Sequence, residues 1–316
     1  MILVTGGLGF IGLHTARALL DMGESVVLTR YRSSAVPDFL KDEVGKRVFI
    51  EAVDLTSPFD IIDVCRRHKV TAICDLFVPR RGALSAGEDL RVKTAGLVNV
   101  LEAGRIAGVK RVAHASSIAV YSSLTKGPFH EDMALPLQSV NETEAFKKAQ
   151  ETLAGHYSDR TGLEVAFLRI GFIYGPLYLR ENRMNPRLIK AGMTGAPASW
   201  AGLPEGDPFE RDSGDATYVT DCARACALIT VADKLPNRAY NIGGGAVVRN
   251  IDIANAVKKV YPTLQFTMKP GFGPGGDRGD TGLDLTRIKN DVGYVPQYDI
   301  ERGMAEWIDY LKTHPM

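Results

Sequence analysis

The chain has 316 residues, of which 45% are hydrophobic and 24% charged, and its formal net charge is +1. This composition is ordinary for a globular protein, and the near-zero charge gives no reason to expect nucleic acid as a partner. No apolar run is long enough to span a bilayer, and the N-terminus leads straight into a strand-like segment without a signal peptide. The four cysteines follow no disulfide or metal-ligand spacing. We therefore expect a cytoplasmic protein with reduced thiols, no bound metal and no membrane partner.

The first twelve residues predict a phosphate site. A short apolar run at 1–4 precedes the segment TGGLGFIG at 5–12, and a helical pattern follows until Gly23. A strand, a glycine turn and a helix present backbone N–H groups to a phosphate, and glycine avoids a Cβ that would block its approach. A plain turn is the alternative. We interpret the segment as a dinucleotide site, with contacts from Gly6, Gly9, Phe10, Ile11 and Gly12.

The rest of the first half alternates short strands with helices. Strands are expected at 25–29, 47–53, 72–77, 111–115 and 164–170, and helices near 59–69, 88–107 and 140–159. This alternation predicts parallel strands with crossover helices, hence an α/β fold with a Rossmann-type doubly wound parallel sheet. We assign residues 1–175, plus about 216–247, to this core.

The C-terminal part has a different texture. Gly, Pro, Ala and Asp crowd residues 191–216, which predicts a loop-rich segment. A helix near 220–232 and a strand near 238–242 return to the core, and further helices are expected after Asn250 and near 300–311. We assign about 176–215 and 248–316 to a smaller C-terminal substrate-binding lobe.

Several segments resemble a known family. The glycine turn is joined by HASSIAVY at 114–121, similar to a Ser-Ser-x-x-Val-Tyr segment, and by RIGFIYGP at 169–176, similar to Arg-Pro-x-Asn-Val-Tyr-Gly-Pro. Glu131, Pro136 and the later segments YVTD at 218–221, YNIG at 240–243 and GYVP at 293–296 also match. In this order they resemble the extended short-chain dehydrogenase/reductases, in particular the NAD(P)-dependent epimerase/dehydratase family. The resemblance implies a nicotinamide dinucleotide cofactor.

The end of the second predicted strand bears on which dinucleotide binds. An acid there would bond the ribose 2′-hydroxyl of NAD, whereas an arginine would pair with the 2′-phosphate of NADP. The segment TRYRSS at 29–34 has no acid, so Arg30, helped by Arg32 and Ser33, favours NADP over NAD. A solvated basic loop is the alternative. Asp54 and Leu55 resemble the family pair that contacts the adenine.

The fourth predicted strand departs from the family pattern. The family usually ends this strand with two small residues beside the cofactor, whereas this chain has Leu76, Phe77 and Val78. Bulky side chains here would crowd the pyrophosphate or the nicotinamide ribose. Lys93 replaces an asparagine that the family often carries. We place these four residues and Ile170 at the cofactor.

The family transfers hydride with a Ser/Thr–Tyr–Lys arrangement. Ser117 matches the serine that bonds the substrate oxygen, and Lys147 matches the lysine that holds the ribose, but Thr143 occupies the tyrosine position four residues earlier. A phenol has a pKa of ~10 and water ~15.7, and this gap is on the order of 8 kcal/mol at ~1.36 kcal/mol per pH unit. One neighbouring ammonium lowers a pKa by only ~1–3. We therefore expect Thr143 to bond or position a water, not to act as the base.

Another group must then move the proton. Tyr121 is the first candidate, with a packed aromatic as the alternative reading. Glu131 and Tyr174 lie in segments that the family places near the active site. His114, inside a predicted strand, is more typical of a satisfied core histidine. Lys147, if desolvated, would titrate nearer neutrality.

The substrate side matches the family only in part. Members that act on nucleotide sugars usually carry asparagine at the position of Phe172 and arginine at that of Gly214. Arg211, three residues earlier, offers a substitute, and Arg278 resembles a later arginine that clamps a diphosphate bidentately. Phe172, Arg211 and Arg278, with Ser117, are the predicted substrate contacts.

The favoured reading is an epimerase/dehydratase-family oxidoreductase that acts on a nucleotide-linked sugar by reversible hydride transfer. The first alternative is a reductase or dehydrogenase of a smaller carbonyl or hydroxy compound, which Phe172 favours. The second is a catalytically impaired dinucleotide-binding sensor or scaffold, which Thr143, Phe77 and Val78 favour. The resemblance also implies a homodimer paired through the helices near 88–107 and 140–159.

Overall fold

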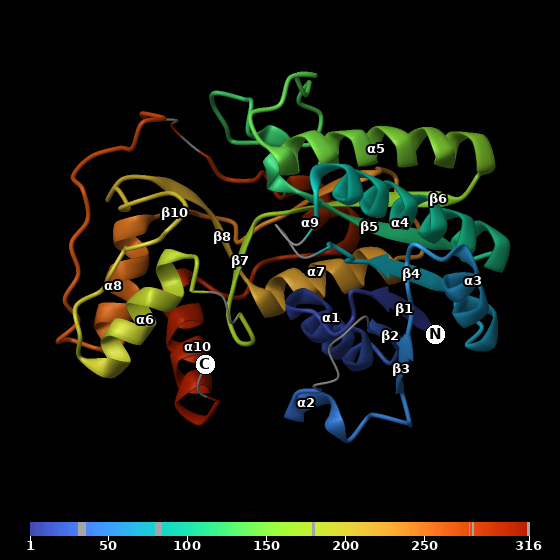
Figure 1. The fold of residues 1–316 in the computed structure, drawn as a ribbon, viewed down its shortest axis with the longest axis horizontal. Coiled ribbons are helices and arrows are strands. Elements are labelled where there is room, and N and C mark those ends of the chain that lie inside the picture. The colour runs from blue at the N-terminus through green and yellow to red at the C-terminus, as the bar shows by residue number, and fades with distance from the viewer. Residues whose placement is uncertain (31–35, 80–83, 179–180, 278, 280, 315–316) are drawn as a thin grey trace.

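A seven-stranded parallel sheet forms the centre of the molecule (Figure 1). The computed structural model describes residues 1–30, 36–79, 84–178, 181–277, 279 and 281–314. The strand order is β3-β2-β1-β4-β5-β6-β9. From β1 the chain adds β2 and β3 on one side and then β4, β5, β6 and β9 on the other, which confirms the doubly wound fold. The strands are β1 Ile2–Thr5, β2 Val26–Arg30, β3 Val48–Ala52, β4 Ala72–Asp75, β5 Arg111–Ser117, β6 Glu164–Ile170 and β9 Ala239–Ile242.

Helices cover both faces of this sheet, which is why its strands are apolar almost throughout. One face packs against α1 (Phe10–Asp21) and α7 (Val219–Val231). The other packs against α3 (Pro58–Arg67), α4 (Ala86–Ala107) and α5 (Glu142–Thr161), the last two lying side by side in Figure 1. Within the described residues, none of these helices is both long and apolar enough to cross a bilayer.

A second core lies at one end of the sheet (Figure 1). A small sheet of order β10-β8-β7 joins the helices there around Trp200 and Trp307. Its β7 and β8 are parallel, and β8 and β10 antiparallel. The elements are β7 Phe172–Tyr174, β8 Ser213–Tyr218, β10 Val247–Arg249, α6 Met184–Thr194, α8 Asn250–Val260 and α10 Ile300–Thr313.

The sequence predicted a loop-rich segment at 191–216, and residues 195–212 indeed form neither helix nor strand. The two ends of the segment differ from this prediction, because α6 runs to Thr194 and β8 begins at Ser213. Leu188 and Ile189 are fully buried against the lobe core, and this tertiary packing outweighs the weak local pattern. Three short elements complete the chain: α2 Asp38–Lys41, η1 Ile118–Tyr121 and α9 Thr286–Val292.

Candidate functional site

The turn after β1 is too tight for any residue but glycine at several positions. Gly6 has a φ of +61°, and its N–H donates to Thr29 Oγ1 at 3.0 Å. A Cβ on Gly12 would lie 2.4 Å from the carbonyl oxygen of Gly6, and one on Gly7 would lie 2.7 Å from Leu28. Backbone therefore packs on backbone around this turn.

The same turn leads directly into α1. Gly9 is the N-cap and has no side chain to bond the first N–H groups of the helix, so these groups and the dipole remain available to an anion. Phe10 and Ile11 begin the helix and are partly exposed at its N-terminus. These observations fit a dinucleotide pyrophosphate at the turn.

The ends of β2 and β3 lie beside this turn. Arg30 is exposed at the end of β2, in register with Ala52 of β3. Arg32 and Ser33, the other two predicted contacts for a 2′-phosphate, lie outside the described residues. The described part of this edge thus offers one arginine at the expected position.

The two residues after β3 are held by local bonds. The Asp54 carboxylate accepts hydrogen bonds from the backbone N–H of Thr56 at 2.9 Å and from its hydroxyl at 2.7 Å. Leu55 is buried, and its carbonyl oxygen accepts a bond of 2.8 Å from the side-chain amide of Asn99 in α4. The pair therefore has a defined position beside the sheet edge.

Helix α4 makes room for the bulky end of β4. A Cβ on Gly96 would lie 3.3 Å from the ring of Phe77, so the missing side chain accommodates the phenyl group. The carbonyl of Leu76 approaches the turn at Gly6, and Val78 is exposed. Of the two bulky side chains, Phe77 is therefore accommodated in part by α4, whereas Val78 is not.

The N-terminus of α5 positions Thr143 and Lys147. The Asn141 side chain caps the helix by accepting the N–H of Glu144 at 2.9 Å, and this fixes the first turn. Thr143 and Lys147 follow one turn apart on the same face. Both line a cavity of about 60 Å³ between the ends of β4 and β5 and the helices α4 and α5.

Lys147 is held against β5 by two hydrogen bonds. Its Nζ donates to the carbonyl of Ala115 at 2.6 Å and to Gln150 Oε1 at 3.0 Å. Burial lowers the pKa of Lys147 to about 8, although the Asp75 carboxylate opposes this change. Desolvation therefore disfavours the charged ammonium at this position.

A buried acid–imidazole pair lies across the same cavity. Oδ2 of Asp75, the last residue of β4, is 2.6 Å from Nδ1 of His114, and its other oxygen accepts the hydroxyl of Thr5. Burial opposes the ionisation of Asp75, but the hydrogen bonds from His114 and Thr5, together with the charges of His114 and Lys147, keep the pKa of Asp75 below its usual value. Nε2 of His114 has no hydrogen-bond partner among the described residues.

Sequence reasoning treated His114 as a satisfied core residue and overlooked this pairing. Asp75 and His114 are direct neighbours in the β4–β5 register. Aligning the two predicted strands side by side would have revealed an acid opposite a histidine. Of the two ring nitrogens of His114, Nδ1 has a hydrogen-bond partner among the described residues and Nε2 has none.

Lys93 links α4 to α5. Its ammonium forms ion pairs with Asp89 at 2.5 Å and Glu142 at 2.8 Å, and it lies 3.9 Å from the ring centre of Phe146. Its side chain also lines the cavity. The charge of Lys93 is therefore already balanced by two carboxylates in the protein without a ligand.

Ser117 ends β5 at the sheet edge. Its side-chain oxygen accepts the N–H of Ala119 at 3.1 Å and caps η1. Ile170 ends β6 directly opposite it in the parallel register and is buried. Ser117 and Ile170 therefore occupy adjacent strand ends, where open α/β sheets bind ligands.

Tyr121 lies in the core. Its ring stacks on Phe129 with centroids 5.1 Å apart, and its hydroxyl donates to Asn241 and accepts from Arg169, both at 2.8 Å. Burial raises the pKa of Tyr121 to about 12. This placement is the one that the packed-aromatic alternative predicts, and both hydrogen bonds of the hydroxyl are made to the protein itself.

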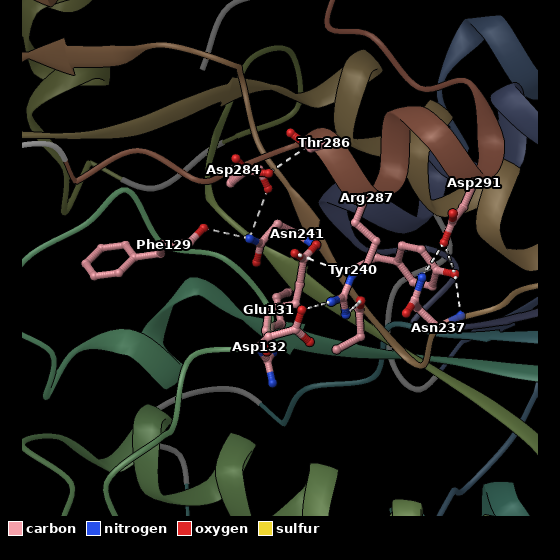
Figure 2. A network of polar contacts seen from close by, with 12 residues as sticks. Phe129, Glu131, Asp132, Asn237, Tyr240, Asn241, Asp284, Thr286, Arg287 and Asp291 are labelled. Carbon is pink, nitrogen blue, oxygen red and sulfur yellow. Dashed lines mark hydrogen bonds and ion pairs between the residues drawn. The ribbon is translucent and has the colours of Figure 1, made fainter.

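Figure 2 shows the polar network that continues from this tyrosine. The Asn241 amide donates to the carbonyl of Phe129 at 2.9 Å, and its backbone N–H donates to the Glu131 carboxylate at 2.8 Å. Arg287 of α9 pairs with Asp132 at 2.6 Å and lies 3.7 Å from Glu131. The Glu131 carboxylate therefore links the segment after η1 to β9 through its hydrogen bond with Asn241.

Tyr174 is likewise part of the packing. It is buried in the lobe core, and its hydroxyl reaches the carbonyl of Asp299 at 3.4 Å. Of the proton-transfer candidates, Lys147 and His114 share the cavity with Thr143, whereas Tyr121, Glu131 and Tyr174 do not line it.

The two departures on the substrate side lie against each other. Phe172 is 51% exposed at the start of β7, and its ring is 3.2 Å from the place where a Cβ on Gly214 would be. The Arg183 guanidinium lies 5.8 Å from the ring centre. Arg211 packs on Phe272 at 4.5 Å, and Arg278 lies outside the described residues.

A doubly wound parallel sheet, a glycine turn that opens a helix and a lysine between β5 and α5 define a dinucleotide-binding α/β protein. The sequence model of the NAD dependent epimerase/dehydratase family matches residues 2–243. The chain therefore belongs to this family of enzymes, as the sequence predicted.

Relatives of known function match along the whole chain. UDP-glucuronate 4-epimerase 1 of Arabidopsis thaliana is 26% identical over 99% of this chain and 77% of its own length. The dTDP-glucose 4,6-dehydratase of Streptomyces griseus is 26% identical, with 99% and 94% covered. The structure of UDP-glucuronic acid 4-epimerase from Bacillus cereus, in complex with UDP-glucuronic acid and NAD, superposes with a TM-score of 0.79 at 22% identity and 99% coverage of both chains.

Proposed function

We propose that this chain is an NADP-linked oxidoreductase that acts on a nucleotide-linked sugar by reversible hydride transfer at a carbinol carbon. The observation that carries the proposal is the glycine turn and α1 N-terminus at one end of the sheet edge, with Ser117 and Lys147 at the other. A nicotinamide dinucleotide, when bound, supplies the carbon that accepts the hydride. The nucleotide-sugar substrates named for the relatives support the substrate class.

The cofactor contacts follow the sheet edge. Phe10 and Ile11, at the N-terminus of α1, would hold the pyrophosphate by backbone N–H groups, and Gly6, Gly9 and Gly12 would let it approach because they carry no Cβ. Arg30 would pair with a 2′-phosphate, which supports NADP although the Bacillus cereus neighbour holds NAD. The remaining contacts are Asp54 and Leu55 at the adenine, and Leu76, Phe77, Val78, Lys93, Lys147 and Ile170 toward the nicotinamide ribose.

The reaction side uses the hydroxyl and ammonium groups of β5 and α5. Ser117 would polarise the substrate oxygen, Lys147 would hold the ribose, and Thr143 would position a water. Arg211 and Arg278 would provide positive charge for a diphosphate. Phe172 would contact the sugar or base.

A second candidate function rests on Phe172 and Gly214. The ring lies over the glycine, at the positions where nucleotide-sugar enzymes of the family usually carry asparagine and arginine. An exposed aromatic surface in place of two polar groups favours a less charged substrate. A reductase or dehydrogenase of a smaller carbonyl or hydroxy compound is therefore the alternative.

The outer surface of α4 and α5 supports a homodimer. Leu90 and Val98 of α4 and Leu153 of α5 are 55%, 46% and 55% exposed, although they are large and apolar. A second copy that covers both helices would remove these side chains from water. Sedimentation measurements should then find a dimer that Leu153→Lys dissociates.

A fluorescence titration with NADPH and NADH tests the cofactor. We expect NADPH to bind at least tenfold more tightly, and Arg30→Asp to reverse this order because it removes the cation and repels a 2′-phosphate. Arg66→Asp, at the far end of the sheet, is the matched control and should change neither affinity. Equal binding of both dinucleotides by the wild type would rule out the role of Arg30.

A substrate panel tests the reaction. UDP-glucose, UDP-glucuronate and dTDP-glucose should be turned over with a bound dinucleotide, whereas small hydroxy compounds should not. The reverse pattern would establish the alternative function. Tight dinucleotide binding without turnover of either group would identify a sensor or scaffold instead.

A further inference from the structure

The Asp75–His114 pair is oriented as a proton acceptor. Oδ2 of Asp75 lies 2.6 Å from Nδ1 of His114, and the Thr5 hydroxyl occupies the other carboxylate oxygen. An ionised carboxylate can only accept hydrogen bonds, so Nδ1 carries the hydrogen. In the neutral ring this leaves the lone pair on Nε2.

That nitrogen is buried without a partner. The His114 side chain is 3% exposed, and Nε2 has no hydrogen bond among the described residues. Buried polar atoms in native proteins are nearly always bonded, so this one requires a water or a ligand group. The cavity of about 60 Å³ is lined by His114, Thr143 and Lys147, and one water needs only about 10–15 Å³.

The cavity also connects His114 to the reaction side. Thr143, which stands at the tyrosine position of the family, is partly exposed and lines the same cavity. A hydroxyl group and a water molecule can relay a proton, but neither is basic enough to keep it at neutral pH. An imidazole, with an ordinary pKa of ~6.5 against ~15.7 for water, can hold it at neutral pH.

We infer that His114, through a water in this cavity, accepts the proton of the substrate hydroxyl that the family's tyrosine would otherwise take. This inference rests on the oxidoreductase function proposed above. The carbinol becomes a carbonyl: the electron pair of its C–H bond leaves as hydride for an oxidised nicotinamide. Its O–H proton passes by Thr143 and the water to Nε2 of His114. The reverse reaction returns both.

Three charged residues line the described part of the cavity together with His114: Asp75 on β4, Lys147 on α5 and Lys93 on α4. The carboxylates of Asp89 and Glu142 offset the charge of Lys93. Asp75 is a positioning residue, because its hydrogen bond sets the tautomer of His114.

Nuclear magnetic resonance of the protein labelled with ¹⁵N-histidine tests the acceptor state without cofactor or substrate. His114→Asn identifies the His114 signals among the six histidines of the chain. We expect the neutral ring to carry its hydrogen on Nδ1 and to have an acceptor Nε2. A hydrogen on Nε2 would overturn the inference.

Kinetics of His114→Ala test the transfer itself. We expect kcat to fall by a factor on the order of 10²–10⁴, as for loss of a general base, with KM changed less than about threefold. Added imidazole should restore much of kcat, because the truncated side chain enlarges the cavity. A merely structural histidine would show no such rescue, and its absence in a variant that still binds NADPH would contradict the inference. His314→Ala, at the exposed end of α10, is the control.

A double variant guards against misfolding and separates the two proposals. Thr143→Tyr in the His114→Asn background should recover at least tenfold in kcat, because a phenol reopens the family's own route. If the wild type turns over no compound of the panel, the proposed function fails. The resonance experiment then still decides whether His114 is an acceptor.

Discussion

The two ends of the candidate site, the β1–α1 turn and the N-terminus of α5, are built differently. At the β1–α1 end, close contacts join backbone to backbone, as between Gly12 and the carbonyl of Gly6. At the α5 end, the cavity is lined by side chains from four elements, including His114, Thr143 and Lys147. Thr143, Phe77 and Val78, which are interpreted from the sequence as departures from the family pattern, all line this cavity at the second end.

The difference follows from what each end has to do. A pyrophosphate is bound by N–H groups that every residue carries, so sequence enters only as the absence of a Cβ. Proton transfer depends on the chemistry of individual side chains, and one acceptor can replace another if both reach the same space. Divergence of reaction chemistry is therefore expected at the α5 end.

The largest effect should come from Gly12→Ala. The added Cβ would lie 2.4 Å from the carbonyl of Gly6 and 2.8 Å from that of Gly7, and neither backbone can move without opening the turn. We expect the free energy of unfolding to fall by about 3 kcal/mol. Displaced N–H groups should also weaken NADPH binding about 10–100-fold.

Gly87→Ala in the first turn of α4 is the control for this variant. Its Cβ would meet only the tip of Arg91, at 3.8 Å. Because alanine favours helix over glycine, we expect up to about 1 kcal/mol of added stability. If Gly12→Ala and Gly87→Ala behaved alike in thermal unfolding and NADPH titration, the backbone contacts at Gly12 would not be what holds the turn.

The same contrast explains what the sequence predicts well. Strand β6 has the predicted bounds 164–170, and the turn at 5–12 begins α1 as expected, because both depend on local pattern. The Asp75–His114 pair can be predicted only if the order and register of β4 and β5 are known. The contact of Phe172 with Gly214 likewise depends on the pairing of β7 with β8. Such features join residues far apart in the chain, and no local propensity reports them.

Lys147→Met should have an intermediate effect with a distinctive pH dependence. Burial lowers the pKa of Lys147 from its ordinary 10.5 to about 8, which corresponds to about 3 kcal/mol at ~1.36 kcal/mol per pH unit. Lost bonds to Ala115 and Gln150 offset part of this gain. We expect the unliganded variant to be about 1–2 kcal/mol more stable than the wild type at pH 7 and to bind NADPH more weakly.

The sign of the pH effect follows from proton counting. Between pH 8 and 10.5 the unfolded chain holds a proton on Lys147 that the folded chain has released, so wild-type stability gains with rising pH. The advantage of Lys147→Met should therefore shrink by about 2 kcal/mol between pH 7 and pH 10. Urea unfolding at both pH values measures it, with Lys258→Met on the exposed surface of α8 as control. A constant difference would show that the folded lysine is not desolvated.

The smallest effect should come from the packing of Phe77 on Gly96. A Cβ on Gly96 would lie 3.3 Å from the phenyl ring, so Gly96→Ala should cost about 1 kcal/mol through overpacking, offset in part by helix propensity. In a Phe77→Leu background the same change should become stabilising by about 0.5 kcal/mol, because the space is then open. Gly87→Ala should show no such coupling to residue 77. Phe77 also lines the cavity at α5, so we expect a ring displaced from α4 to enter that cavity. Gly96→Ala should then also weaken NADPH binding, whereas the double variant should not. Unchanged NADPH binding in both the single and the double variant would mean that the Phe77 ring moves without entering the cofactor site. The contact with Gly96 would then not be needed to keep that site open.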